Sequence, residues 1–75
     1  MEEYSVKITK HIGNIKTTGS GWTKELNLVS WNSKEPKYDI RDWDESHIRM
    51  TRGITLTEEE FKVLVEIIKK MEEEK

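Results

Sequence analysis

The chain has no cysteine and no long apolar run, and each of these two absences excludes a class of protein. Without cysteine there are no disulfides and no thiolate metal sites, and only His11 and His47 remain as imidazole ligands. No stretch approaches the roughly 20 apolar residues that span a bilayer. The start, Met1-Glu2-Glu3-Tyr4, lacks the basic and apolar parts of a secretion signal. We therefore expect a soluble cytoplasmic protein, which could also associate with the nucleoid.

The small size of the chain, 75 residues, predicts a single domain spanning residues 1–75. A domain this short buries only about 60% of the surface that its unfolded chain exposes. Such domains usually need a disulfide, a metal or a partner chain for stability. Because disulfides are excluded and we expect neither a metal nor another cofactor, a second copy of the chain is the predicted stabiliser.

The charge is unevenly distributed along the chain, whose formal net charge is −2. Residues 57–75 carry seven acidic and four basic side chains, whereas residues 1–56 carry nine basic and eight acidic ones. The acidic excess therefore lies in the C-terminal part. Because the rest is nearly balanced, a polyanionic ligand has to be argued from the placement of individual bases.

The clearest local signal is a helix predicted at residues 58–73. Thr57 and Glu60 have the spacing of a capping box, and three glutamates in the first turn suit the positive end of the helix dipole. The apolar residues cover an arc of about 200°, wider than the stripe of about 100° that packing on one sheet requires. Either the helix is sunk in a groove of its own domain, or it packs on its own sheet and on a partner helix. We favour the second arrangement, which leaves three residues for a dimer interface: Val63, Ile67 and Met71.

Two strands are predicted upstream, at residues 22–31 and 37–43, because apolar residues alternate there with period two. The polar turn at 32–36 contains the only proline and joins them into an antiparallel hairpin. One face of the hairpin carries Leu26 and Ile40, and we expect this face to pack on the helix.

Two further strands complete the predicted sheet. The first runs over residues 4–10, with a bulge at Gly13 and a continuation to Ile15. The last runs over residues 48–56 and is interrupted by Gly53. The expected fold is therefore α+β, with a four-stranded antiparallel sheet followed by one C-terminal helix.

The face of the hairpin away from the helix combines aromatic rings with cations. It holds five such residues, one of them in the turn: Trp31, Lys34, Lys37, Arg41 and Trp43. A tryptophan on an exposed sheet face lacks the burial that usually explains tryptophan, and stacking on a nucleobase restores about 1–3 kcal/mol per base. Since duplex DNA hides the faces of its bases, the pattern favours a single strand.

The same face is also compatible with roles that need no nucleic acid, and the pattern alone does not choose between them. Trp31 and Trp43 could cover each other as a cross-strand pair. Arg41 could pair with Asp39 or Asp42. The face could also be a dimer interface.

Other polar residues are candidates for lesser roles. Arg52 has the parity of the core residues in the last strand, but the glycine that follows could turn it outward, and Lys24 could reach round from a strand start. Asp42, Asp44 and Glu45 are interpreted as solvated charges, and His11 as a surface residue of its strand. No glycine loop for phosphate and no nucleophile set is present, so we do not expect an enzyme.

Three segments that follow one another along the chain together form one pattern. Its parts are an aromatic strand end, a basic turn, a strand reading Asp-Ile-Arg-acidic-aromatic, and a basic-Gly-Ile-Thr-Leu strand that leads into the helix. The three segments are Trp22-Thr-Lys-Glu-Leu-Asn-Leu-Val-Ser-Trp31, Pro36-Lys-Tyr-Asp-Ile-Arg-Asp-Trp43 and Arg52-Gly-Ile-Thr-Leu-Thr-Glu-Glu-Glu60. This pattern resembles the bacterial YdbC-like family and, more distantly, the C-terminal domain of the eukaryotic transcriptional coactivator positive cofactor four. The resemblance covers residues 22 to about 70.

The resemblance implies a strongly curved sheet, a dimer formed through the helices, and single-stranded DNA bound in the sheet channels with little sequence preference. It also implies five contact residues: Trp31, Lys37, Arg41, Trp43 and Arg52. We add Lys24 and Lys34 as assisting cations.

The predicted function is thus non-sequence-specific binding of single-stranded DNA, with RNA as a further ligand, in transcription or DNA maintenance. Neither a membrane nor a small-molecule substrate is expected as a partner. The alternative is a dimeric protein-interaction module of the transcription machinery that uses the same aromatic face.

Overall fold

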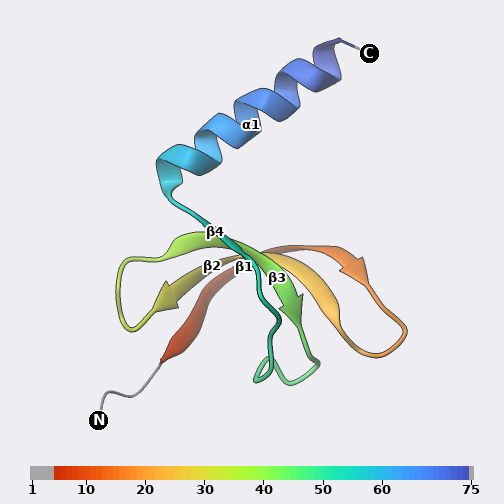
Figure 1. Cartoon of the computed structure of the whole chain (residues 1–75), viewed down its shortest axis with the longest axis vertical. Coiled ribbons are helices and arrows are strands. Elements are labelled where there is room, and N and C mark those ends of the chain that lie inside the picture. Colours follow the sequence, from red (N-terminus) through yellow and green to blue (C-terminus); the bar gives the residue numbers. More distant parts are fainter. Residues whose placement is uncertain (1–4, 75) are drawn as a thin grey trace.

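Four strands and one helix make up the chain in the computed structural model, which describes residues 5–74. They are β1 (Val6–Thr17), β2 (Thr23–Trp31), β3 (Lys37–Trp43), β4 (Ile54–Leu56) and α1 (Glu58–Glu73). The strands form one antiparallel sheet in the order β1-β2-β3-β4. The sheet is arched, and α1 leaves from its convex side (Figure 1). The predicted α+β architecture is confirmed.

The β2–β3 hairpin has the predicted boundaries to within one residue. Its pairing runs without a register shift from Thr23 opposite Trp43 to Val29 opposite Lys37. The turn reverses the chain through positive φ angles, 52° at Asn32, a residue type that tolerates this conformation. Because the register is regular, alternate residues of β2 and β3 lie on opposite faces of the sheet.

Helix α1 begins at the predicted capping box. The Thr57 hydroxyl accepts from the Glu60 N–H at 3.1 Å, and the Glu60 carboxylate accepts from the Thr57 N–H at 2.8 Å. The helix contacts the sheet at its start, where the Phe61 ring stacks on Tyr38 with ring centroids 3.8 Å apart. Beyond this contact α1 projects away from the sheet, and none of its residues is buried (Figure 1). The expectation that the helix packs along its own sheet is therefore met only in its N-terminal half, where Phe61, Leu64 and Val65 are half-buried.

The two faces of the sheet can now be named. Since Tyr38 meets α1, the even-numbered residues of β2 and β3 form the convex face, and the odd-numbered residues form the concave face. Among the described residues, those that are buried lie on the concave face: Glu25, Asn27, Val29, Asp39 and Trp43. The alternation of apolar residues predicts the core on the opposite face, where Leu26 and Ile40 are only half-buried. That expectation is wrong because α1 leaves the convex face largely uncovered.

Strand β1 is bulged rather than regular. Its pairing with β2 shifts register at three places: between Ile8 and Lys10, between His11 and Gly13, and between Asn14 and Lys16. One of them is the bulge predicted at Gly13. Each extra residue reverses the alternation of side chains. The residues of β1 opposite the concave-face positions of β2 are consequently not of one parity: Val6, Ile8, His11, Asn14 and Thr17. Tyr4, which was assigned to this strand, lies outside the described residues.

Strand β4 is shorter than the predicted strand at 48–56. Met50 pairs with Trp43 only as an isolated bridge, and residues 44–49 form a loop. The prediction is wrong because the Asp44 carboxylate accepts two consecutive backbone N–H groups of that loop, each at 3.0 Å. Such local bonds compete with strand pairing. In residues 5–74 no helix is long and apolar enough to cross a membrane.

Candidate nucleic-acid interface

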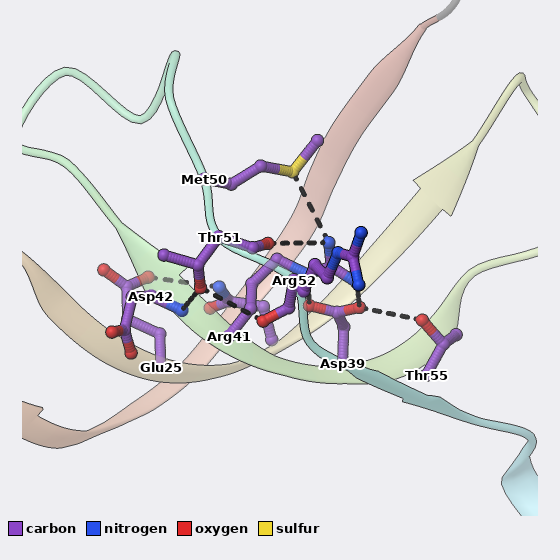
Figure 2. Close-up of polar contacts among 9 residues, drawn as sticks. Glu25, Asp39, Arg41, Asp42, Met50, Thr51, Arg52 and Thr55 are labelled. Atoms are coloured by element: carbon purple, nitrogen blue, oxygen red, sulfur yellow. Dashed lines mark hydrogen bonds and ion pairs between the residues drawn. The ribbon is translucent and has the colours of Figure 1, made fainter.

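A buried ion pair anchors the middle of the concave face (Figure 2). Arg41 donates from Nε and Nη2 to the two carboxylate oxygens of Asp39, at 2.6 and 2.7 Å. Asp39 is fully buried and also accepts from the Thr55 hydroxyl on β4 at 2.9 Å. Two parallel charge-assisted bonds fix the plane of the guanidinium. Of the two carboxylates that the sequence offered as partners for Arg41, Asp39 is the one observed.

The fixed guanidinium supports the Trp31 ring. The Arg41 Cζ atom lies 4.6 Å from the centroid of that ring. A cation held over an indole contributes about 0.5–1 kcal/mol when exposed and about 2 kcal/mol when desolvated. Trp31 itself is half-buried. It does not form a cross-strand pair with Trp43, because Trp43 lies opposite Thr23, eight residues from Trp31 along β2.

The chain crosses Arg41 closely at Gly53. A Cβ atom at position 53 would overlap the carbonyl oxygen of Ile40 and would lie 2.5 Å from the Arg41 Cβ. No side chain fits there without a shift of the backbone, since protein interiors leave few voids. The glycine after Arg52 therefore has a steric reason: it lets the segment before β4 lie against β3.

Three of the predicted cations are exposed around this pair. Lys37 lies opposite Val29, Lys34 lies in the turn after Trp31, and Arg52 lies beside Gly53. None of the three side chains forms an ion pair with another residue of the described range. A polyanion can therefore be met by these cations without breaking an existing pair.

Lys24 differs from those three because it lies on the convex face, with the other even-numbered residues of β2, and is already paired. Its Nζ lies 2.9 Å from Asp42 Oδ1, and both side chains are partly exposed. An exposed pair of this kind is worth only about 0.2–1 kcal/mol. The expectation that Lys24 assists the contact residues is nevertheless wrong, because its side chain faces away from the concave face.

Trp43 is buried, which corrects the expectation of an exposed ring. Only 2% of the residue is accessible, and the His47 imidazole stacks on its indole with centroids 5.9 Å apart. The loop after β3 places His47 there in a left-handed backbone conformation, with φ 60°. The buried indole N–H of Trp43 has no acceptor among the described residues. In this arrangement Trp43 belongs to the core, and a base reaches it only if the loop moves.

A polar network that the sequence analysis missed lies on the same face. The Glu25 carboxylate is 3% exposed; its Oε2 lies 2.8 Å from His47 Nε2, and its Oε1 accepts from Asn27 Nδ2 at 3.1 Å. The side-chain oxygen of Asn27, Oδ1, lies 2.7 Å from His11 Nδ1. His11, interpreted as a plain surface residue, is therefore tied into this network. The polar residues Glu25 and Asn27 at alternate positions of β2 are a signal of this network that the sequence contains. The bulges that bring His11 opposite Asn27 leave no such signal in the sequence.

The carboxylates at positions 42–45 do not converge on one point. Asp44 holds its own loop: its carboxylate accepts from the N–H groups of Ile48 and Arg49 and from the Ser46 hydroxyl. Partial desolvation raises the pKa of Asp44, but the bonds from Arg49, Ser46 and Ile48 outweigh it and bring the pKa below its usual value. Within residues 5–74 no group of three His, Asp or Glu side chains is arranged to hold a metal ion.

The fold and the concave face together define a class of protein. It is a small arched antiparallel sheet with one C-terminal helix, and the concave face of the sheet carries a tryptophan in contact with an arginine, together with exposed lysine and arginine side chains. The family model for "Transcriptional Coactivator p15 (PC4)" matches residues 19–67, which is most of the chain. The chain belongs to this family. Membership indicates a nucleic-acid-binding, coactivator-like function.

A bacterial relative extends the similarity beyond the matched segment. An uncharacterized protein of Treponema pallidum (strain Nichols) is 36% identical over 70 residues, covering 93% of this chain and 82% of the relative. All of β1 lies before residue 19 and hence outside the family match, whereas the alignment with this relative covers nearly the whole chain.

Proposed function

We propose that the protein binds single-stranded DNA on its concave face, and RNA by the same chemistry, without requiring a particular sequence. The observation that carries this proposal is the Trp31 ring supported by Arg41, which Asp39 holds in place. A ring that is already positioned loses little side-chain entropy when a base stacks on it. Stacking tolerates any base because every base has a flat face.

The phosphates of the strand are met by the cations Lys34, Lys37 and Arg52, which form no ion pair with another described residue, whereas Lys24 lies with Asp42 on the convex face and does not contribute. Arg41 lies further inside, so its role is to hold Trp31 and to add positive potential. Each phosphate neutralised on a single strand contributes about −0.7 to the slope of log affinity against log salt. Trp43 is a second stacking residue in a form of the protein where the loop has moved away.

We further propose that the protein is a homodimer formed through α1, with Val63, Ile67 and Met71 at the interface. These side chains are 54–59% exposed in the single chain. The chain has an accessible surface of 6192 Å², against about 4,800 Å² for a compact monomer of this mass. Its radius of gyration is 14.1 Å, against about 11 Å for a compact domain. A second copy covers more than half of this excess, since a standard interface buries about 800 Å² per partner.

The proposed dimer is not an enzyme and acts in transcription or DNA maintenance, as a YdbC-like member of its family. The competing proposal, a protein partner on the same face, differs in its response to salt. A phosphate channel weakens steeply as salt rises, whereas a peptide groove responds little.

The decisive experiment is fluorescence anisotropy of a labelled oligothymidine, single-stranded and then duplex, at two salt concentrations. We expect the single strand to bind more tightly than the duplex, with a negative salt slope. Trp31→Ala should weaken binding by about 1–3 kcal/mol because one stacking platform is lost.

The matched control is Trp22→Ala, which removes a tryptophan outside the β2–β3 hairpin and should leave the affinity nearly unchanged. Sedimentation of both variants checks that association of the protein is unaltered. Equal affinity for single strand and duplex, or an unaffected Trp31→Ala variant, would contradict the stacking proposal.

A further inference from the structure

The concave face contains a cavity at some distance from Trp31. Its volume is about 360 Å³, within the usual range of about 300–1,000 Å³ for ligand pockets. Six residues line it: Ile8, His11, Asn14, Thr23, Glu25 and His47. Glu25 and Trp31 are six residues apart on β2, or about 20 Å along the strand. A nucleic-acid strand with one base stacked on Trp31 can therefore extend to the cavity.

The buried Glu25 carboxylate gives the cavity a distinct chemistry. A carboxylate offers about four lone-pair positions, and here Asn27 and His47 occupy two at 3.1 and 2.8 Å, with His11 Nδ1 3.4 Å from Oε1. No lysine or arginine of the described residues lies within ion-pair distance of Glu25. The remaining lone-pair positions of the Glu25 carboxylate can only accept hydrogen bonds. The carboxylate therefore attracts N–H groups of a ligand and repels carbonyl oxygens.

The other lining residues suit a flat polar ligand. The imidazole rings of His11 and His47 are planar, and Ile8 adds an apolar contact. The side chains of Asn14 and Thr23 form no hydrogen bond with another described residue, so their donors and acceptors are available. A planar ring with polar edges matches this combination.

We propose that this cavity binds one nucleobase of the bound strand, and that Glu25 makes it prefer a base with an exocyclic amino group, guanine above the others. Guanine presents its ring N–H and its amino group side by side, as two donors for one carboxylate. Thymine presents a single N–H between two carbonyl oxygens, which the carboxylate repels. The inference rests on the proposed binding of single strands and adds one position of base preference to it.

Half of the cavity comes from a part of the chain that the family match leaves out. Ile8, His11 and Asn14 lie on β1, and the match begins at residue 19. The register shifts of β1 bring these three residues to the concave face. The carboxylate that sets the base preference lies within the family match, whereas half of the cavity around it is built by β1.

The test uses the full chain and three labelled strands in fluorescence anisotropy. One is all thymidine, one carries a single central guanine, and one carries hypoxanthine, which is guanine without its amino group. The guanine strand should bind about 5- to 150-fold more tightly than the thymidine strand, the discrimination of one good bidentate contact. The hypoxanthine strand should fall between the two. In NMR spectra, the ring signals of His11 and His47 should shift with the guanine strand and stay in place with the thymidine strand.

The variant Glu25→Gln replaces one acceptor oxygen with a donor amide and should bring the ratio of the two affinities close to one. Because Glu25 is buried, its substitution can disturb the fold. The histidine signals of the unaltered protein therefore serve as a second measurement, which needs no variant. Tight and equal binding of all three strands would overturn the inference and leave the proposed function standing. A guanine advantage that persists in Glu25→Gln, or that leaves both histidines unshifted, would also overturn it. Failure of every strand to bind would reject the proposed function itself.

Discussion

The concave face of the sheet and the apolar side of the protein, which is the convex face together with α1, differ in how their side chains are buried. On the concave face, one chain is sufficient: Asp39, Arg41, Glu25 and Asn27 are paired with one another or with their neighbours inside the fold. On the convex face and along α1 the apolar side chains stay half-buried or exposed. The polar interface is thus preorganised in each chain, whereas the hydrophobic stabilisation depends on what covers the other side.

This difference is useful for a binding protein. A ligand face held by ion pairs and hydrogen bonds keeps its geometry regardless of the ligand. In the proposed dimer, the apolar side is completed by a second copy, which couples folding to association and makes stability depend on protein concentration. Substitutions on the two sides should therefore have different signatures, and three of them test the contrast.

The largest effect is expected from Ile67→Lys on the exposed stripe of α1. An isoleucine buried in an interface contributes about 1.5–3 kcal/mol, and in a symmetric dimer each change occurs twice. Dissociation of the dimer should become easier by about 3–6 kcal/mol, or at least about 100-fold. Glu66→Lys, which places the same side chain on the polar face, should leave association nearly unchanged. Analytical ultracentrifugation over a range of concentrations distinguishes them, and equal behaviour of the two variants would place the interface elsewhere.

A large effect is also expected on the concave side, from Asp39→Asn. Removing one partner of a buried ion pair leaves Arg41 uncompensated, and such changes destabilise by about 3–5 kcal/mol. The matched change Asp42→Asn removes an exposed pair with Lys24 and should cost about 0.2–1 kcal/mol. Urea unfolding at one fixed protein concentration measures both. If the two variants unfold at the same urea concentration, the Asp39–Arg41 pair does not anchor the fold.

Gly53→Ala should have a moderate effect. The added methyl overlaps the carbonyl of Ile40 and the Arg41 side chain, and overpacking of this kind destabilises by about 1–3 kcal/mol. Gly13→Ala is the control, because nothing lies within 4 Å of a Cβ at that position. The unfolding midpoints should differ in that order, and affinity for a single strand should fall only in Gly53→Ala. A neutral Gly53→Ala would mean that the chain does not cross Arg41 so closely.

The parts of the fold that follow from local signals could be predicted from the sequence. The helix at 58–73 and its cap depend on neighbouring residues alone, and the regular alternation of β2 and β3 predicts their hairpin. The length of β4 could not be predicted, because Asp44 takes backbone donors that a longer strand would need.

For the candidate site, the sequence predicts which residues of the hairpin share a face, whereas their burial and contacts depend on tertiary structure. Alternation shows which side chains share a face, but the coverage of that face is decided by the arch of the sheet and by the loop carrying His47. For this reason Trp43 was expected to be exposed and is buried. The cavity at Glu25 was missed because the β1 residues that line it have different parities, which only the bulges reconcile.

Those bulges have a consequence for the behaviour of the protein at high concentration. β1 is an edge strand, and a long flat edge with free N–H and C=O groups recruits strands from other molecules. Three register shifts within twelve residues twist this edge and interrupt the even spacing of its backbone groups. The strand that helps to shape the concave face therefore also resists unwanted sheet extension, which favours a dispersed protein over one that associates through its sheet edges.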